Sequence, residues 1–444
     1  MKNLIKPSLL FGITVMLMIS GCTPKKELPP LDGSQLLHQL NASLTDAIIH
    51  DGFSPPVASR VYAYPNIAAY EAVRFEDDNF TSYAGKLNGL NEPLPEPENL
   101  DKYAPLVAMT VAFIDVGKAL IYRDYLLDSA QTAMLDTLKP YYSEAIYNSS
   151  MEYGHTLAGK LLDWINKDMY KETRNMPRFS PTGELGKWEP TPPTFGESVE
   201  PHWMKIRPLV LDSLYIMDDP IPFDSTEGSA FYNATYDVYN AVAAAEKDEH
   251  EYALFWDCNP QKTNVKGHFM FVTRQLTPGG HWMAIATIAI KMKDYDLVNS
   301  AYVYSLMSVS IMDVFINCWQ EKYRTDLIRP ETYINRYIEP NWEPFLETPL
   351  FPEHPSGHSS ISGAAATILT HIFGDNFAYT DSSEEPFGLK PRSYKSFNEA
   401  ANEAMMSRFH GGIHYMPACT VGLEMGQKVA KVALAKADVK QSTK

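Results

Sequence analysis

The C-terminal half of the chain carries three short motifs that combine cationic, hydroxyl and imidazole side chains. Lysine and arginine bind anion oxygens, a serine hydroxyl adds a further hydrogen bond, and imidazole transfers protons near neutral pH. A site that collects these groups would bind a tetrahedral oxyanion and act on it chemically. In chain order the residues are Lys322 and Arg329; Ser356, Gly357 and His358; and Arg408 and His414.

The first motif places Arg329 seven positions after Lys322 and directly before Pro330. Seven residues rotate a helix by about 700°, roughly 20° short of two turns, so we expect both cations on one helix face. Pro330 disfavours helical geometry at Arg329, ends the element and places the guanidinium at a rim. The alternative is an ordinary solvated basic face.

The second motif is Ser356-Gly357-His358, followed by a run of small residues. Gly357 lets the backbone approach a ligand, Ser356 offers a hydroxyl, and a helix start supplies free N–H groups. His358 in the same turn is placed for proton transfer. The alternative is an ordinary helix cap.

The third motif joins Arg408 to His414 across Gly411 and Gly412. The glycines break the helix and allow the chain to turn back, so that both side chains face one site. The imidazole of His414 would then coordinate the central atom of the oxyanion. The alternative for a single histidine is a structural role.

The order K-x6-RP, PSGH and SR-x5-H resembles the superfamily of type 2 phosphatidic acid phosphatases and vanadium-dependent haloperoxidases. The resemblance to the haloperoxidase branch extends to residues 54–62, residues 278–282, Asp313 and the 318–323 segment. It implies an all-α fold of two helical bundles, with the site in the second. Phe351, seven positions before His358, is similar to the aromatic residue of the chloroperoxidase type.

The resemblance also implies a role for each motif residue. His414 is the vanadate ligand of a peroxidase, or the nucleophile that takes the phosphoryl group in a phosphatase. His358 is the general acid and base. Vanadate is the implied cofactor, and phosphate fits the same site. The oxygens of the anion are held by Lys322, Arg329, Ser356, Gly357 and Arg408.

The chain departs from the superfamily pattern at Ala418, where the pattern has an aspartate that orients the ligand histidine. Its loss is expected to weaken His414, unless a backbone carbonyl or another acid substitutes. Asp313 and Asp326 are expected to neutralise part of the cationic cluster, because three unpaired cations are costly to bury.

We therefore expect an enzyme that oxidises bromide or chloride with hydrogen peroxide on bound vanadate. One alternative is a metal-independent acid phosphatase that hydrolyses soluble phosphate monoesters through phospho-His414. Another is a catalytically weak oxyanion-binding lipoprotein, which the alanine at position 418 suggests. The net charge of −16 and the absence of a long basic run argue against nucleic acid as a partner.

The N-terminus resembles a bacterial lipoprotein leader. Residues 1–21 are predicted to be a signal peptide, Cys22 the lipidated residue, and residues 22–34 a tether. The protein would then be exported and lipid-anchored in the outer membrane, at its periplasmic face or at the cell surface. We identify no further apolar stretch of about 18 residues, which argues against a membrane-embedded phosphatase. The other three cysteines show no C-x-x-C pair and no zinc-like cluster with histidine.

Apolar residues at three- and four-residue spacing predict a mostly helical chain with few strands. We expect an N-terminal bundle over residues 35–250, with a long proline-rich loop at 171–228, and a C-terminal bundle with the oxyanion site over residues 251–440. The predicted helices are 35–50, 59–74, 106–123, 129–138, 143–166, 229–246, 281–292, 296–328, 359–373, 397–406 and 418–435.

Overall fold

A computed structural model describes residues 28–260, 262–266 and 268–441. The chain divides into two units, Met1–Leu31 and Asp32–Lys444. Residues 28–31 of the first unit form no helix or strand. The predicted signal peptide and Cys22 lie outside the described residues, so export and lipidation stay predictions. All further description concerns the second unit.

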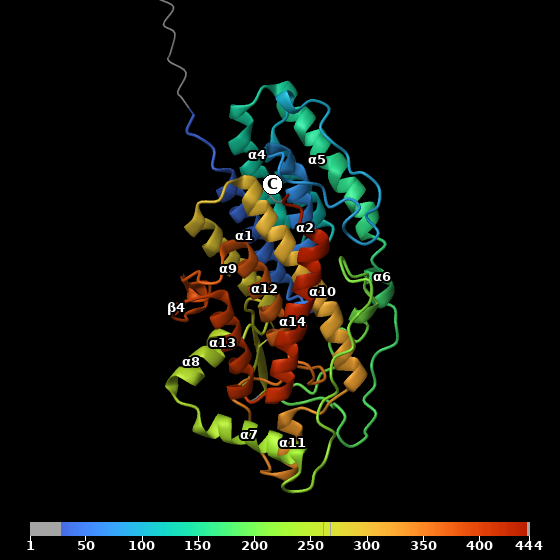
Figure 1. Ribbon diagram of the computed structural model, residues 1–444, viewed down its shortest axis with the longest axis vertical. Coiled ribbons are helices and arrows are strands. Elements are labelled where there is room, and N and C mark those ends of the chain that lie inside the picture. The colour runs from blue at the N-terminus through green and yellow to red at the C-terminus, as the bar shows by residue number, and fades with distance from the viewer. Residues whose placement is uncertain (1–27, 261, 267, 442–444) are drawn as a thin grey trace, which may run out of the picture. The chain divides into compact units, whose positions relative to one another are not determined.

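The second unit is all-α, as predicted, and two short antiparallel hairpins accompany its helices (Figure 1). Most helix bounds lie within a few residues of the predicted ones, and the division near residue 250 stays a prediction. The α-helices are α1 (Gly33–Asp51), α2 (Pro55–Val73), α3 (Pro105–Lys118), α4 (Tyr125–Leu138), α5 (Glu144–Ile165), α6 (Tyr170–Thr173), α7 (Ala230–Ala244), α8 (Lys247–Phe255), α9 (Pro278–Lys293), α10 (Leu297–Thr325), α11 (Pro330–Tyr337), α12 (Gly357–Phe373), α13 (Phe397–His410) and α14 (Met416–Ala437). Strand β1 (Lys262–Lys266) pairs with β2 (Phe269–Thr273), and β3 (Tyr379–Asp381) pairs with β4 (Arg392–Tyr394). The 3-10 helices are η1 (Arg74–Glu76), η2 (Leu100–Lys102), η3 (Lys139–Tyr141), η4 (Trp203–Lys205) and η5 (Glu385–Phe387).

Helix α10 lies at the centre of the unit and packs against α2, α12 and α14. Most of its residues are buried, which explains why the helix is mainly apolar. In Figure 1 it runs between the end that carries α4 and α5 and the end that carries α7 and α11. Our expectation of no further long apolar stretch was wrong, because α10 is long and apolar enough to cross a membrane. Its most apolar part is 100% buried inside the protein, as in a core helix.

Glycines allow α12 and α14 to approach closely. A Cβ atom on Gly426 would lie 2.0 Å from the carbonyl oxygen of Ser360, and one on Gly363 would lie 2.4 Å from that of Leu423. Both distances are far below contact distance, so only glycine fits at these positions. The close packing brings the N-terminus of α14 to the N-terminus of α12, where the second and third motifs meet.

The proline-rich segment 171–228 contains little regular structure, as predicted, but α10 fixes part of it. Asp313 accepts hydrogen bonds from the backbone N–H groups of Leu209, Val210 and Leu211 at 2.5–2.9 Å. One and two turns further along α10, Asn317 and Glu321 bind the backbone N–H groups of residues 215 and 217. The expectation that Asp313 neutralises the cationic cluster was therefore wrong, since its carboxylate holds this loop.

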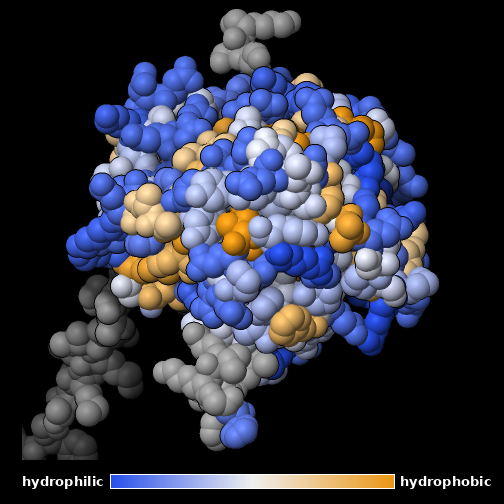
Figure 2. Space-filling model, turned by 90° about the horizontal axis from the view of Figure 1, so that it is seen from below, coloured by the Kyte–Doolittle hydropathy of each residue, from blue (hydrophilic) through white to orange (hydrophobic). Residues whose placement is uncertain are grey.

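The surface at the end with α7 and α11 is mainly hydrophilic (Figure 2). Hydrophobic residues on this face form small, separate groups. Isolated apolar residues of this kind are normal on a folded protein.

Candidate oxyanion-binding site

Three cations of the motifs are buried, and two of them contact one aromatic ring. Lys322, Arg329 and Arg408 are each at most 1% exposed. The Nζ atom of Lys322 lies 4.9 Å from the ring centre of Phe351, and the guanidinium carbon of Arg329 lies 5.0 Å from it. Both cations contact the π face of the ring, which stabilises them away from water.

Lys322 and Arg329 converge, but not in the way that the spacing predicts. Helix α10 ends at Thr325, and Asp326 follows with a left-handed φ of 50°. Arg329 is the N-cap residue of a separate helix, α11, with extended φ and ψ of −77° and 152°. A sharp turn, and not a shared helix face, brings the two cations together. Arg329 is also fully buried and not at a rim.

Backbone carbonyl groups bind the cations. Lys322 donates to the carbonyls of Pro352 and Glu353 at 2.9 and 3.0 Å. Arg329 donates to the carbonyls of Phe351 and Ile413, both at 2.9 Å. One terminal nitrogen of Arg329, NH2, is buried without a hydrogen-bond partner among the described residues. That nitrogen is available to an anion.

Burial weakens the charged state of these groups. It lowers the pKa of Lys322 to about 7 and that of Arg329 to about 10. Neighbouring positive charge adds to the effect, since Arg329 also lowers the pKa of Lys322. A bound anion would raise both pKa values, so anion binding and the charged state of these two groups favour each other.

His414 lies at the same cluster and is held by a carboxylate. Arg329 NH1 donates to His414 Nε2 at 3.3 Å, which places the ring proton on Nδ1. Nδ1 then donates to Glu353 Oε1 at 2.7 Å, and the same oxygen accepts from the N–H of Tyr415. Burial and the charges of Arg329, Lys322 and Arg408 hold the pKa of His414 well below its ordinary value, so the ring is neutral.

Glu353 fills the role left open by Ala418. It is fully buried, and burial raises its pKa to about 7 although Arg329 and Lys322 oppose the rise. We expected either a backbone carbonyl or another acid in place of the missing aspartate, and the structure has an acid. No spacing rule marks this glutamate in the sequence, because Glu353 comes 61 residues before His414. Glu353 and Ala418 line the same small cavity.

The second motif begins α12. The hydroxyl oxygen of Ser356 accepts two hydrogen bonds from Ser359, one from its backbone N–H at 3.3 Å and one from the Ser359 hydroxyl at 2.9 Å. Ser356 is therefore the N-cap residue of this helix. A Cβ atom on Gly357 would lie 4.0 Å from the Cε atom of Lys322. His358 Nε2 is buried with no hydrogen-bond partner in the part of the chain that the structure describes. Burial and Arg408 lower the pKa of His358 well below its ordinary value, which leaves a neutral base.

A cavity of about 340 Å³ reaches the motif residues. His358, Arg408 and Phe351 line it, together with Asp257 and Cys258. Its wall also includes the start of α2 and part of the proline-rich segment, so that distant parts of the chain form it. The volume is sufficient for a small ligand.

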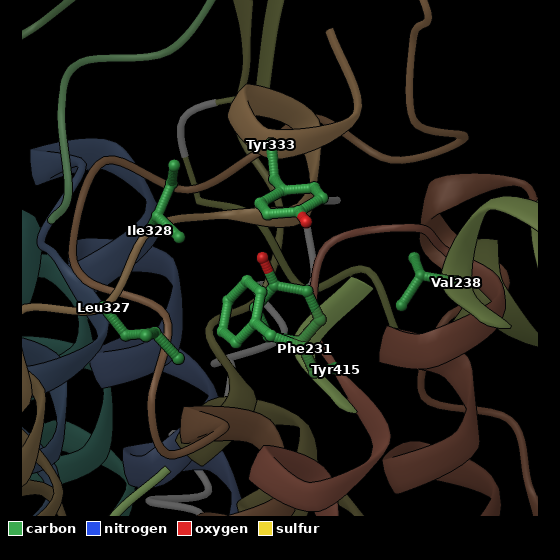
Figure 3. Packing of buried hydrophobic residues seen from close by; sticks show 6 residues of the cluster. All are labelled: Phe231, Val238, Leu327, Ile328, Tyr333 and Tyr415. Atoms are coloured by element: carbon green, nitrogen blue, oxygen red, sulfur yellow. The ribbon is translucent and has the colours of Figure 1, made fainter. Parts of the chain in front are cut away.

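Aromatic packing fixes the backbone on either side of the site (Figure 3). The ring of Phe231 packs between Tyr333 and Tyr415, with a distance of 5.2 Å between ring centres in each case. Tyr415 directly follows His414, and the cluster also holds Ile328, which directly precedes Arg329. Well-packed neighbours of this kind keep the two site residues in place.

The chain is similar to haloperoxidases of known structure. It is 41% identical to a protein described as the first bacterial vanadium-dependent iodoperoxidase, with a TM-score of 0.88 over 94% of this chain and 100% of that chain. The chain belongs to the vanadium-dependent haloperoxidase family. Vanadium-dependent haloperoxidases are enzymes, and their cofactor is vanadate.

Other comparisons agree with this family. The family description "VCPO second helical-bundle domain" matches residues 302–441, which contain all three motifs. The holo and apo forms of a bacterial vanadium-dependent chloroperoxidase share the haloperoxidase fold at 15% and 13% identity, each with a TM-score of 0.63. They cover 88% and 87% of this chain and 96% and 95% of the chloroperoxidase chains. Among curated proteins, none shows a significant sequence match.

The site of this haloperoxidase suits vanadate. The cluster of Lys322, Arg329 and Arg408 is buried, and its hydrogen bonds go mainly to neutral carbonyl groups. Arg329 NH2 and His358 Nε2 are buried without hydrogen-bond partners among the described residues. Unsatisfied buried groups of this kind are costly. An oxyanion would accept a hydrogen bond from the Arg329 guanidinium, and a hydroxyl group on the bound anion would donate one to the neutral His358 ring.

Proposed function

We propose that this haloperoxidase oxidises halide ions with hydrogen peroxide at a vanadate held by the three motifs. One observation carries the proposal. Three buried cations meet a neutral imidazole that a buried glutamate orients. This arrangement supplies positive charge and an unprotonated ring nitrogen, which Arg329 contacts at 3.3 Å, to one anion.

Each residue then has a defined task. Lys322, Arg329 and Arg408 hold the oxygens of the anion, and the Ser356 hydroxyl and Gly357 N–H complete the shell. His414 Nε2 is the ligand of the central atom, and Glu353 keeps the proton on Nδ1. The bound vanadate supplies the Lewis-acid centre at which peroxide becomes reactive toward halide.

His358 is proposed to move the proton. Its low pKa keeps it neutral, so that it can accept the proton of hydrogen peroxide through its unpartnered Nε2. The cavity that it lines admits peroxide and halide. Phe351 forms part of the cavity wall, in position to contact the halide.

The test is peroxide-dependent halide oxidation by the purified chain, with and without orthovanadate, at about pH 6. Iodide is the first halide to measure, because the 41% identical relative is an iodoperoxidase; bromide and chloride follow. We expect activity that requires vanadate and is lost in His414→Ala. Vanadate binding without halide oxidation would contradict the proposal. Phosphate monoester hydrolysis would then identify an acid phosphatase, and no turnover would leave a binding protein.

A further inference from the structure

A second cluster of metal-binding side chains lies next to the oxyanion site. Cys258 Sγ, His281 Nδ1 and Glu384 Oε1 all lie within 4.8 Å of one another. The Sγ atom is 3.2 Å from Nδ1, and the Oε1 atom is 3.3 Å from Nδ1. The three residues come from the segment after α8, from α9 and from the segment before η5, and each is at most 4% exposed.

The imidazole of His281 is oriented for metal binding. Its Nε2 lies 2.8 Å from Asp381 Oδ2, and both side chains are fully buried. The ring also stacks on Trp256, with ring centres 4.4 Å apart and planes at 19°. A carboxylate that accepts the proton of one ring nitrogen fixes the other nitrogen toward a metal, which is the usual arrangement of histidine ligands.

Glu384 Oε1 is buried at this cluster and has no hydrogen-bond partner among the described residues, and the backbone at Cys258 is strained. Cys258 has a φ of 43°, a left-handed conformation that is rare for cysteine. Such backbone strain persists where surrounding structure requires it, often at functional sites. Here it turns the thiol toward His281.

The geometry points to a site for a zinc-like divalent transition metal, with Cys258, His281 and Glu384 as ligands and Asp381 as the residue that orients His281. One sulfur, one nitrogen and one carboxylate oxygen suit Zn²⁺ or Co²⁺ and not Mg²⁺ or Ca²⁺, which prefer oxygen ligands alone. Three protein ligands leave a fourth position open. Cys258 lines the 340 Å³ cavity, which gives a small ligand a route to it.

The charge of the bound metal ion is balanced by the release of two protons. The ion replaces the thiol proton of Cys258 and the proton on Nδ1 of His281, and both pass to solvent. The sequence interpretation, which found no zinc-like cluster for the cysteines, missed this group. Its members lie 23 and 103 positions apart along the chain, so that no local motif marks them.

The metal would stabilise one wall of the oxyanion site. Asp257 precedes Cys258, and its carbonyl accepts from Arg408 NH1 at 3.4 Å. Its carboxylate forms an ion pair with Lys262 at 3.1 Å. A metal on Cys258 would therefore fix the segment that holds Arg408. This inference is independent of the halide chemistry, because the metal site shares no ligand with the vanadate site.

The test is titration of the metal-free full chain with Co²⁺, followed by absorption spectroscopy. We expect one equivalent to bind, with a thiolate-to-cobalt charge-transfer band that Zn²⁺ abolishes by competition. Cys258→Ser should lose the band, whereas Cys318→Ser, which removes another buried thiol, should keep it. Asp381→Asn should weaken binding by about 10- to 100-fold without removing the band.

Two outcomes would overturn the inference. One is a folded chain that binds no stoichiometric Co²⁺, because His281 then forms only an ion pair with its carboxylates. The other is a band that persists in Cys258→Ser. If Cys258→Ser does not fold, Glu384→Gln tests the site instead. This variant keeps the thiol, and we expect it to lower Co²⁺ affinity by at least about tenfold. Unchanged affinity in Glu384→Gln overturns the site. None of these measurements depends on halide turnover.

Discussion

Glu353 Oε1 lies 2.7 Å from His414 Nδ1, and this contact supplies from a loop what the superfamily pattern takes from position 418. The same loop, residues 351–353, supplies carbonyl groups that bind Lys322 and Arg329. One short segment therefore binds the cations through its backbone and orients His414 through the side chain of Glu353. The two functions are coupled, because displacement of this loop would disturb both.

Glu353→Gln is expected to lower vanadate affinity and halide turnover by about 10- to 100-fold. An amide cannot supply the negative charge that keeps the ring proton on Nδ1. The measurement is a vanadate titration of activity. Glu331→Gln is the matched control, since Glu331 is also buried but, in the described part of the chain, forms no hydrogen bond or ion pair with His414. Equal loss in both variants would mean that Glu353 acts only on stability.

Ala418→Asp is expected to restore part of the lost activity in the Glu353→Gln background. Both positions line one small cavity, so that an aspartate at 418 lies near the site of the missing carboxylate. Activity of the double variant against that of Glu353→Gln is the measurement. No gain in a folded double variant would show that position 418 cannot reach His414 here.

His358→Ala is expected to reduce halide turnover by about 10²- to 10⁴-fold, because the proton acceptor for peroxide is lost. Vanadate affinity should change by less than about tenfold, since His358 is not proposed as a ligand. Turnover and vanadate Kd are measured separately. His371→Ala, at the exposed end of α12, is the control. A parallel fall of affinity and turnover would assign His358 to binding.

Phe351→Leu is expected to weaken vanadate binding by about tenfold. The change removes the ring beneath Lys322 and Arg329, and each cation–π contact contributes about 0.5–2 kcal/mol. Phe345→Leu, which removes a ring stacked on His250 outside the cluster, is the control. Unchanged affinity in Phe351→Leu would show that the backbone carbonyls alone hold the cations.

Asp313→Asn is expected to destabilise the protein more at pH 4.5 than at pH 7. Burial raises the pKa of Asp313 to about 6, although three backbone N–H groups oppose the rise. The folded state therefore binds the proton of Asp313 more tightly than the unfolded state does. Protonated Asp313 stabilises the fold below about pH 6, and this stabilisation is lost as the pH rises through 6. The loss of unfolding free energy caused by Asp313→Asn is about 2 kcal/mol larger at pH 4.5 than at pH 7. Urea unfolding of both proteins at each pH measures it, and a pH-independent difference would contradict the assignment.

Gly426→Ala is expected to destabilise the fold by about 1–3 kcal/mol or more, because the added methyl would lie 2.0 Å from the Ser360 carbonyl oxygen. Gly159→Ala is the matched control. A Cβ atom on Gly159 meets nothing within 4 Å, and alanine in its helix should add up to about 1 kcal/mol. Thermal unfolding distinguishes the two. Equal stability of both variants would mean that α12 and α14 can separate without cost.

The sequence predicted the parts of the fold that follow from local periodicity. Most long helices, the irregular segment 171–228 and the break at residues 411–412 are as expected, and Gly412 has the left-handed φ of 79° that such a break requires. Helices α8 and α11 were missed because each spans nine residues or fewer, too few to show a clear period. The predicted helix to residue 328 was too long, since a left-handed Asp326 carries no strong sequence signal.

The types and order of the motif residues in the sequence predicted a shared site, and the structure places these residues in one cluster. It could not predict the partners of those residues. Glu353, Asp313 and His281 all act through contacts with residues more than 20 positions away, and the chain path alone determines those contacts. Long-range polar contacts have no period and no fixed spacing, so local pattern cannot reveal them.

The side chains of Asp313, Asn317 and Glu321 act on the loop as a neighbouring strand would, because they bind successive backbone N–H groups along it. Those amide hydrogens can exchange with solvent only when the loop separates from α10. The N–H groups of residues 209–211, 215 and 217 should therefore exchange as slowly as those of the central helices, although these residues form no helix or strand. In hydrogen exchange this proline-rich segment will behave as part of the core.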